Sequence, residues 1–360
     1  MSLFIGLFAW SDITKLQVPE GFEIQEFVTE IDDARQMVEG SNFIFVGTKS
    51  AGNVYAIDKN NANKVSVILT ELDMPTGVAL KNGDLYIAET DTIHVVKNIE
   101  EKLSSNKEIT TEIFFSDLPR KTMWNPVTKG WHGWKWIDFG PDGALYISEG
   151  VPCNVCDEDD PRYGTILKLE NDNLSIFADG VRNSVGFDWH PVTQKLYFSD
   201  NGRDWMGDDS PSCELNVVEN DGDFFGYPYK HATDVIDPEF GDLIPTLDKE
   251  FIDPIAELGP HVAPLGITFY DSNLFPSKYK NSIFIALHGS WNRTKKSGYK
   301  VIFVELDDNG NYVRQEDFIT GWLDNEQAWG RPVSPFVMSD GSLLISDDKH
   351  NVIYRVTYSG

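Results

Sequence analysis

Short hydrophobic runs recur along the chain, usually after a turn and mostly ending on a small or acidic residue. Six copies stand at residues 42–47, 84–89, 144–149, 195–200, 282–287 and 342–347. Three of them follow the dipeptides Asn82-Gly83, Asp142-Gly143 or Asp340-Gly341, which are typical of hairpin turns. An apolar run of about four residues suits a strand buried on both faces. Helical spacing of apolar residues is scarce, so the pattern predicts an all-β protein.

Most of these runs are followed by a second β-rich run, at residues 52–57, 92–96, 164–169, 299–304 and 352–356. Six such units of uneven length are typical of a six-bladed β-propeller. A β-sandwich or two stacked barrels is the alternative that the same pattern allows. We find no linker and no low-complexity tract, so we predict one propeller domain over residues 16–360.

The surplus length falls in three insertions, at residues 119–136, 151–163 and 221–264. Loops that lie on one face of a rigid scaffold commonly form its functional site. We therefore expect the site at the face that carries these insertions.

The composition is strongly acidic, with a formal net charge of −27 over 360 residues. A surface of this charge repels phosphate backbones, which argues against a nucleic-acid partner. The charge either maintains solubility, reflects a saline habitat, or accompanies Ca²⁺ sites, which need carboxylates. No run approaches the ~18 apolar residues of a membrane helix. Residues 1–15 begin with a short apolar stretch, which we interpret as a remnant of a signal segment.

The chain has three cysteines. Cys153 and Cys156 form a C-x-x-C pair, and Cys213 stands apart. Without a second pair this is weak support for zinc. A local disulfide and two free thiols both remain open, and a disulfide would indicate an oxidising compartment.

Several histidines and arginines stand near predicted strand ends. His132 lies among tryptophans in residues 130–136 (GWHGWKW), where desolvation favours its neutral form and suits a general base. It could equally be a packed, hydrogen-bonded histidine. The same two interpretations, ligand contact or structural clamp, apply to Arg182 with Asn183, and to His261, His288, Arg293 and Arg331. Together these cations in an acidic protein predict a pocket for a polyanionic ligand.

The loop at residues 201–214 carries the oxygen donors that Ca²⁺ prefers, but not the EF-hand spacing. A solvated acidic loop is the alternative. The chain has no dinucleotide-binding, P-loop, nucleophile-elbow or H-E-x-x-H motif, which disfavours NAD chemistry and serine hydrolysis.

A set of longer motifs carries a resemblance to a known family. They stand at residues 19–24 (PEGFEI), 180–191 (GVRNSVGFDWHP), 199–209 (SDNGRDWMGDD), 214–216 (ELN), 225–228 (FGYP), 261–266 (HVAPLG), 288–293 (HGSWNR) and 330–333 (GRPV). In these residues the chain resembles the sorbosone dehydrogenase-like proteins, which belong with the soluble aldose sugar dehydrogenases that use pyrroloquinoline quinone (PQQ). The resemblance covers residues 16–358.

The resemblance implies a six-bladed propeller that binds PQQ and Ca²⁺ and oxidises an aldose to its lactone or acid. It implies a sugar substrate, an external electron acceptor (a quinone or cytochrome), no transmembrane segment, and a periplasmic or secreted location. His132 matches the catalytic base, while Arg182 and Asn183 match the pair at the quinone oxygens. Gly202 and Arg203 match the backbone carbonyls that hold Ca²⁺.

The resemblance also assigns Arg331 to the PQQ carboxylates and Glu214 to a further Ca²⁺. His261, His288 and Thr76 depart from the family, which has Thr, Lys and Gln at the matching places; we count them, with Arg293, as cofactor-binding candidates. The acidic partner of the base is displaced, and Glu149 is the substitute we suggest. A Ca²⁺-dependent lactonase-like hydrolase and a non-catalytic binding propeller are the alternative functions.

Overall fold

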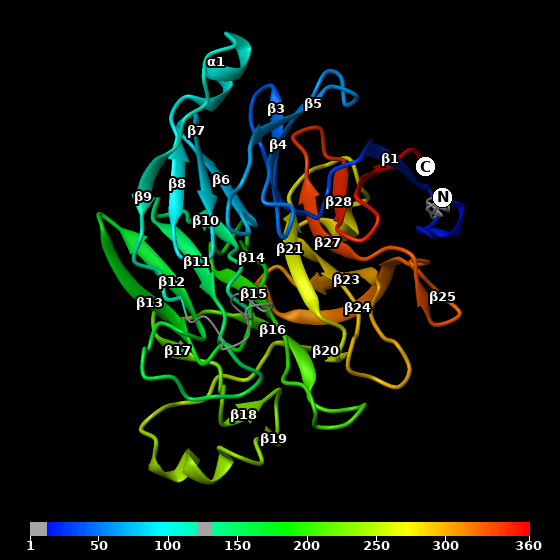
Figure 1. Ribbon diagram of the computed structural model, residues 1–360. Helices are drawn as coiled ribbons and strands as arrows, with labels where there is room; N and C mark the ends of the chain where they lie inside the picture. Colours follow the sequence, from blue (N-terminus) through cyan, green and yellow to red (C-terminus); the bar gives the residue numbers. More distant parts are fainter. Residues whose placement is uncertain (1–12, 121–131) are drawn as a thin grey trace, which may run out of the picture.

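The computed structural model describes residues 13–120 and 132–360. Within these ranges the chain forms six main sheets arranged as the blades of a propeller (Figure 1). Around most of the ring the innermost strands of neighbouring blades contact one another. The predicted all-β, six-bladed fold is therefore confirmed. The predicted signal remnant lies almost wholly outside the described residues.

Blades 1 to 3 come from the first half of the chain. Blade 1 comprises β2 (Ala34–Glu39), β3 (Phe43–Thr48), β4 (Val54–Asp58) and β5 (Val65–Leu69). Blade 2 comprises β6 (Gly77–Lys81), β7 (Asp84–Ala88), β8 (Ile93–Val96) and β9 (Glu112–Phe115), with the short helix α1 (Ile99–Ser104) before β9. Blade 3 comprises β10 (Ile137–Phe139), β11 (Leu145–Glu149), β12 (Thr165–Glu170) and β13 (Asn173–Asp179), with β17 (Asp223–Phe224) added parallel to β13.

Blades 4 to 6 complete the ring. Blade 4 comprises β14 (Phe187–Trp189), β15 (Leu196–Asp200), β16 (Ser212–Val217) and β20 (Ala256–Pro260). Blade 5 comprises β21 (Pro264–Tyr270), β22 (Ser282–Leu287), β23 (Lys300–Leu306) and β24 (Tyr312–Ile319). Blade 6 comprises β27 (Pro332–Val337), β28 (Leu343–Asp347), β29 (Val352–Tyr358) and β1 (Phe22–Thr29).

The six repeated hydrophobic runs are the second strands of the six blades, which are β3, β7, β11, β15, β22 and β28. These strands are buried along almost their whole length because each blade packs against a neighbour on both faces. Phe45, Ile87 and Leu85, for example, share one core cluster between blades 1 and 2. Each such side chain stabilises the fold by roughly 1.5–3 kcal/mol through burial.

The ring is closed by the two ends of the chain. The N-terminal strand β1 pairs antiparallel with the C-terminal strand β29, from Phe22 opposite Tyr358 to Thr29 opposite Val352. Blade 6 is thus built from strands of both ends of the chain, with β1 added to β27, β28 and β29 (Figure 1). This pairing removes the open edge that a linear array of blades would leave.

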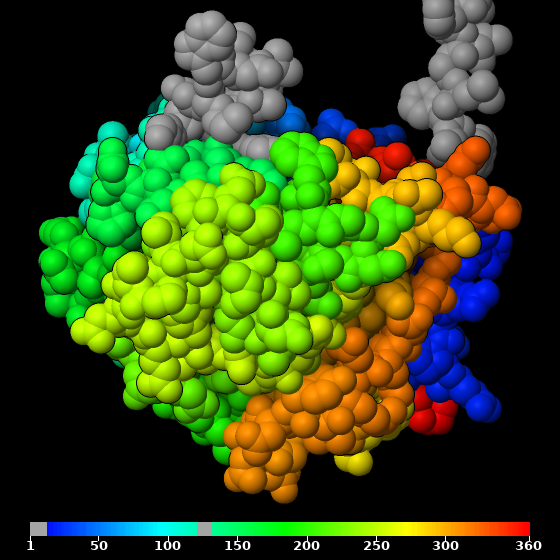
Figure 2. Space-filling model, turned by 90° about the horizontal axis from the view of Figure 1, so that it is seen from below, coloured from blue at the N-terminus to red at the C-terminus, as the bar shows by residue number. Residues whose placement is uncertain are grey.

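The connection between β16 and β20 is the largest insertion. It holds β17, the hairpin β18 (Lys230–His231) and β19 (Val235–Ile236), and a 3₁₀ helix at Gly241–Thr246. In the view from below, this yellow-green segment forms a large part of the visible face (Figure 2). The hairpin β25 (Leu323–Asp324) and β26 (Gln327–Ala328) and the 3₁₀ turns Ile13–Lys15 and Ser277–Tyr279 complete the elements. No helix in the described ranges is long and apolar enough to cross a membrane.

Each blade begins at its innermost strand and turns back through its second strand. Because the two strands are antiparallel, the start of the first and the end of the second lie at the same edge of the blade. The ring therefore brings twelve such strand ends together around one end of the propeller axis. This is where the candidate site is found.

Candidate active site

A cavity of about 230 Å³ lies at this end of the propeller. Its lining is contributed mainly by inner-strand starts, second-strand ends and the loops that follow them. The lining residues are Arg35, Lys49, His132, Trp134, Arg182, Asn183, Asn201, Gly202, Asp204, Cys213, His261, Ala263, Leu265, His288, Gly289, Trp291 and Arg331. Seven of the eleven predicted site residues are thus brought together: His132, Arg182, Asn183, Gly202, His261, His288 and Arg331.

The lining is positively charged although the protein is strongly acidic. Arg35, Lys49, Arg182 and Arg331 contribute basic groups, and among the described residues of the lining Asp204 is the one acidic side chain. Burial and the neighbouring charge of Arg35 lower the pKa of Lys49 from 10.5 to about 8. A shift in this direction means that the cavity disfavours further positive charge. The electrostatics therefore favour an anionic ligand.

His132 is held in a fixed orientation at the cavity wall. The residue has a positive φ of 57°, and its Nδ1 donates a hydrogen bond to the carbonyl oxygen of Val151 at 2.9 Å. In the neutral ring Nε2 is then the acceptor nitrogen. Burial, reinforced by the positive charge of Arg182, holds the pKa of His132 well below its usual value. The imidazole is accordingly neutral and able to accept a proton.

Gly150, which directly follows β11, allows His132 to pack closely against the backbone at this position. A Cβ at Gly150 would lie 2.6 Å from the His132 Cβ, 2.7 Å from its carbonyl oxygen and 2.9 Å from Oδ1 of Asn183. Position 150 therefore has room for the hydrogen atom of glycine but not for a side chain.

Arg182 and Asn183 lie on the loop before β14. Their backbone N–H groups donate to the two carboxylate oxygens of Asp200, at 2.8 Å and 2.6 Å. The Arg182 guanidinium donates from NH1 to the carbonyl oxygen of Asn201 at 3.0 Å. Asn183 Oδ1 is buried and accepts no hydrogen bond from the described residues, so it is an acceptor that a bound ligand can use.

A buried carboxylate joins the cationic groups on the other side of the cavity. Asp348 pairs with Arg35 at 2.7 Å and with His288 at 2.8 Å. Burial lowers the pKa of His288 to about 4, so His288 donates as a neutral ring. Arg331 donates to the carbonyl oxygens of His288 at 3.0 Å and Gly289 at 2.7 Å. These contacts fix the basic groups before any ligand arrives.

Four predicted site residues do not line the cavity. Thr76 donates its hydroxyl to the Lys135 carbonyl oxygen at 2.8 Å, and Arg203 pairs with Asp237 and Glu239. Glu214 accepts hydrogen bonds from the Asn216 side chain at 2.9 Å and the Ala232 N–H at 2.6 Å. Arg293 donates to the Asp208 carbonyl oxygen and the Asp209 carboxylate, both at 2.9 Å. The side chains of all four bind other parts of the protein.

Glu149 does not take the role suggested for it. Its carboxylate pairs with Lys135 at 2.7 Å, and neither side chain is exposed. His132 uses the Val151 carbonyl instead. The suggestion is not supported by these contacts, because Lys135 neutralises the Glu149 carboxylate and a backbone carbonyl takes the place of an acidic partner at His132 Nδ1.

Arg35 and Lys49 were missed by the sequence reasoning. Lys49 directly follows β3, as His288 directly follows β22, so the repeat itself carried a signal for it. Arg35 is the second residue of the inner strand β2, and no motif surrounds it.

The cysteine alternatives are resolved by the structure. Cys153 and Cys156 form a disulfide. Cys213 is a buried free thiol at the cavity, and burial raises its pKa to about 11. It is accordingly a protonated, unreactive side chain at neutral pH.

Within residues 13–120 and 132–360, no group of three or more His, Cys, Asp or Glu side chains could hold a metal ion. Of the predicted Ca²⁺ ligands, Gly202 and Arg203 would act through backbone carbonyls and Glu214 through its carboxylate. The Ca²⁺ site stays a prediction.

The chain is similar to known proteins in its sequence and in its fold. It is 36% identical to an uncharacterised protein of Borreliella burgdorferi over 95% of this chain and 91% of that protein. Residues 246–359 match the TrAA12-like family. The holo PQQ domain of pyranose dehydrogenase from Coprinopsis cinerea superposes with a TM-score of 0.78 at 15% identity, covering 95% of this chain and 97% of that one. A calcium structure of the family AA12 enzyme from Trichoderma reesei gives 0.76 at 18% identity, covering 96% and 97%. The chain therefore belongs to the family of the Borreliella burgdorferi protein, and it has the fold of the PQQ-dependent sugar dehydrogenases that its sequence resembles.

Proposed function

We propose that the protein is a PQQ-dependent dehydrogenase that oxidises an aldose. The observation that carries this proposal is the cavity. Within the described part of the chain its lining holds four basic side chains and three histidines but one acidic side chain, in a protein of net charge −27. The alternative polyanions, phosphates of nucleic acid, are disfavoured by the acidic surface. The fold supports the choice of PQQ, because it is shared with the holo PQQ domain of pyranose dehydrogenase from Coprinopsis cinerea.

The donor set fits this cofactor. PQQ carries three carboxylates, for which guanidinium groups provide matched donors. Arg35 and Lys49 of blade 1 and Arg331 of blade 6 would hold them, with His261 and His288 beside them. When bound, the cofactor supplies a quinone that accepts the electrons of the sugar.

The protein's own contribution is proton transfer and charge stabilisation. His132 accepts the proton of the sugar hydroxyl at Nε2, since its Nδ1 is engaged by Val151. An anion in the cavity offsets the charges of Arg182 and Lys49 and raises the pKa of His132 toward neutrality, which suits a general base. Arg182 stabilises negative charge that develops during the reaction. Trp134 and Trp291 restrict water at the walls.

We further propose that Ca²⁺ binds beside the cofactor, with backbone oxygens of the segment at Asn201 and Gly202 and the Asp204 carboxylate as protein ligands. Support comes from their place in the lining, from the preference of Ca²⁺ for such oxygens, and from the calcium structure of the Trichoderma reesei relative. Asn183 Oδ1 offers a further unpaired oxygen.

The natural substrate in this proposal is a sugar of the aldose class, and the final electron acceptor is an external quinone or cytochrome. We propose a location outside the cytoplasm. The Cys153–Cys156 disulfide supports it, because such bonds persist mainly in oxidising compartments.

The test is a titration of metal-free protein with PQQ, with and without Ca²⁺, followed by absorbance, and then addition of an aldose panel. We expect saturable binding that depends on Ca²⁺, followed by reduction of the bound quinone on addition of sugar. His132→Gln should bind PQQ with similar affinity but lower kcat by about 10²–10⁴-fold, the range for loss of a general base. His94→Gln is the matched control, since His94 pairs with Glu89 on blade 2, outside the cavity lining.

If the protein binds PQQ but oxidises none of the sugars, the dehydrogenase function is contradicted and a non-catalytic binding propeller is favoured. If the folded protein binds no PQQ, the cofactor assignment is contradicted. Ca²⁺-dependent hydrolysis of a lactone would then favour the hydrolase. Equal kcat in His132→Gln and His94→Gln would remove His132 from the reaction.

A further inference from the structure

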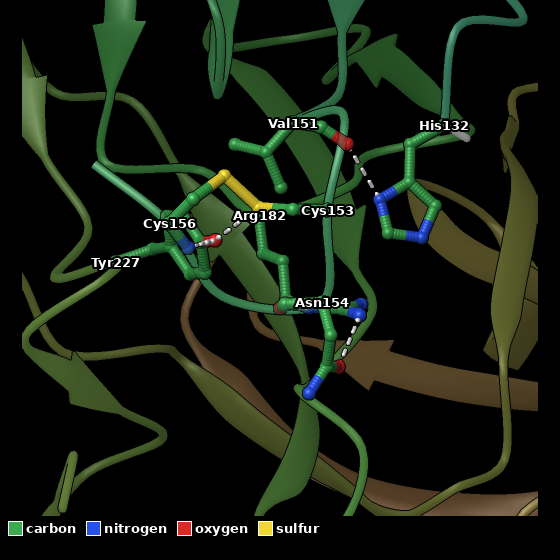
Figure 3. Close-up of a disulfide and its surroundings, with 7 residues drawn as sticks. All are labelled: His132, Val151, Cys153, Asn154, Cys156, Arg182 and Tyr227. Carbon is green, nitrogen blue, oxygen red and sulfur yellow. Dashed lines mark hydrogen bonds between the residues drawn. A yellow bond between two sulfur atoms is a disulfide. The ribbon is translucent and has the colours of Figure 1, made fainter. Parts of the chain in front are cut away.

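The disulfide-closed loop of residues 151–156 contacts both residues that the proposed reaction uses. Figure 3 shows Val151 of this loop beside His132 and Asn154 beside Arg182. The Val151 carbonyl oxygen accepts the hydrogen bond of His132 Nδ1 at 2.9 Å. The Val151 N–H donates to the Arg182 carbonyl oxygen at 3.0 Å. The first residue of the loop therefore links the two.

Asn154, at the centre of the loop, orients the Arg182 guanidinium. Arg182 donates from Nε to the Asn154 carbonyl oxygen at 2.9 Å and from NH2 to Asn154 Oδ1 at 3.0 Å. Asn154 Oδ1 also accepts from the Asp204 N–H at 2.8 Å, and Asn154 Nδ2 donates to the Asp204 carbonyl oxygen at 3.0 Å. Asn154 is buried, with 8% of its surface exposed. One side chain thus joins Arg182 to the loop that carries Asp204.

The disulfide and Tyr227 hold Asn154 in this place. Cys153 and Cys156 are bonded on either side of it. The Tyr227 hydroxyl accepts from the Cys156 N–H at 2.8 Å and lies 3.5 Å from Cys153 Sγ. The segment has no regular secondary structure, so cross-links of this kind must provide its order. Both cysteines are half-buried, which leaves them within reach of a small reductant.

We propose that Asn154 is a positioning residue for Arg182, and that the Cys153–Cys156 disulfide makes this positioning sensitive to redox conditions. The proposal rests on the proposed function for the roles of Arg182 and His132. A dithiol reductant would supply two electrons and two protons. Its thiolate attacks one cysteine sulfur, the S–S bond breaks, and its second thiolate resolves the mixed disulfide, leaving two protein thiols and an oxidised reductant.

Reduction allows the segment around Asn154 to move, so the Arg182 guanidinium loses two hydrogen-bond acceptors that are otherwise held in place, the carbonyl oxygen and Oδ1 of Asn154. The Val151 contact to His132 loosens with it. Misplacement of a reacting group by about 1 Å can lower a rate by about 10²-fold. Ligand binding by Arg35, Lys49 and Arg331 should change less. Arg35 is held by Asp348, Arg331 by the loop at His288, and the Lys49 ammonium lies over the Trp134 ring, so none of these contacts involves the 151–156 loop.

The experiment compares the oxidised enzyme, the enzyme treated with dithiothreitol, and the double variant Cys153→Ser, Cys156→Ser. Three properties are measured on each: kcat and KM for the sugar, the Kd of PQQ by absorbance, and amide hydrogen exchange of residues 151–156 and 182–183. We expect reduction to lower kcat about 10–100-fold, to leave the Kd of PQQ at saturating Ca²⁺ within a few-fold, and to speed exchange at Val151 and Cys156. The double variant should have the same kcat and exchange pattern as the reduced enzyme, and dithiothreitol should not change them.

Two single variants separate positioning from stability. Asn154→Ala should lower kcat with the disulfide intact, and Asn154→Asp, which keeps the Oδ1 acceptor, should restore part of it. Tyr227→Phe should speed exchange at Cys156 while the disulfide remains. If the double variant is unfolded, the reduced wild-type enzyme and Asn154→Ala still test whether the loop positions Arg182.

An unchanged kcat in the enzyme whose thiols are shown to be free would overturn the proposal, as would unchanged hydrogen exchange across the loop. A lower melting temperature with unchanged kcat would mean that the disulfide stabilises the fold but does not affect the reaction. Should the oxidised enzyme oxidise no sugar, the proposed function fails by itself. The exchange pattern would then still show whether the disulfide orders Val151, Asn154 and Arg182.

Discussion

Replacing Gly150 by alanine adds one methyl group between His132 and Asn183. The φ of Gly150 lies outside the left-handed region, so the backbone tolerates alanine and the effect comes from contact alone. The new Cβ would lie 2.6 Å from the His132 Cβ and 2.7 Å from its carbonyl oxygen. Carbon atoms in contact prefer a separation of about 3.5–4.0 Å. His132, β11 or both must therefore move by about 1 Å.

A shift of this size affects the rate more than the stability. Overpacking of a buried site costs about 1–3 kcal/mol, which a domain of this size can tolerate. Displacing a general base by about 1 Å can reduce the rate by about 10²-fold. We therefore expect Gly150→Ala to fold, to bind PQQ with little change in Kd, and to lose about 10²-fold in kcat.

The assay is steady-state dye reduction by the PQQ-loaded enzyme, with the melting temperature measured in parallel. Gly40→Ala is the matched control, because a Cβ there meets the carboxylate end of Glu100 on the surface, which can move aside. A Gly150→Ala enzyme with normal kcat and only a lower melting temperature would refute the reasoning. It would mean that the position of His132 is not critical for the reaction.

Two further predictions concern charges at and beside the cavity. The pKa of Lys49 is lowered from 10.5 to about 8, and a bound anion raises it again. Binding therefore takes up a proton above pH 8, so PQQ affinity should fall as the pH rises through about 8 to 10.5. Lys49→Met should weaken binding about tenfold or more and flatten this pH dependence; an unchanged absorbance titration would exclude Lys49 from the ligand. Glu149→Gln leaves Lys135 buried without its ionic partner, and we expect a loss of about 3–5 kcal/mol in the free energy of unfolding, measured by denaturant titration. The additional change Lys135→Met should recover part of this loss, and failure to do so would show that the pair is not coupled.

The fold was predictable because its signal is local and repeated. Each second strand is covered on both faces by neighbouring blades, so it needs a hydrophobic run wherever it occurs, and the six runs coincide with β3, β7, β11, β15, β22 and β28. The turn dipeptides before three of them are equally local. What the pattern did not predict was that β1 completes blade 6, because that pairing joins residues more than three hundred positions apart.

The candidate site was predictable only in part. His132, Arg182, Asn183, Gly202, His261, His288 and Arg331 stand in distinctive motifs near strand ends, and all seven line the cavity. Arg203, Glu214, Arg293 and Thr76 stand in comparable motifs, yet their side chains bind elsewhere. A motif fixes which residues are near one another in sequence, but not which way a loop side chain points.

The sequence by itself thus determined the number of blades, the acidic character and most of the polar groups at the strand ends, because these depend on patterns a few residues long. The tertiary structure decided which of those groups share a cavity, that Glu149 serves Lys135 and not His132, and that Arg35 and Lys49 join the site. It also decided that the 151–156 loop contacts both His132 and Arg182. These outcomes depend on closing a ring of six blades, which sets the distances between residues that no local pattern connects.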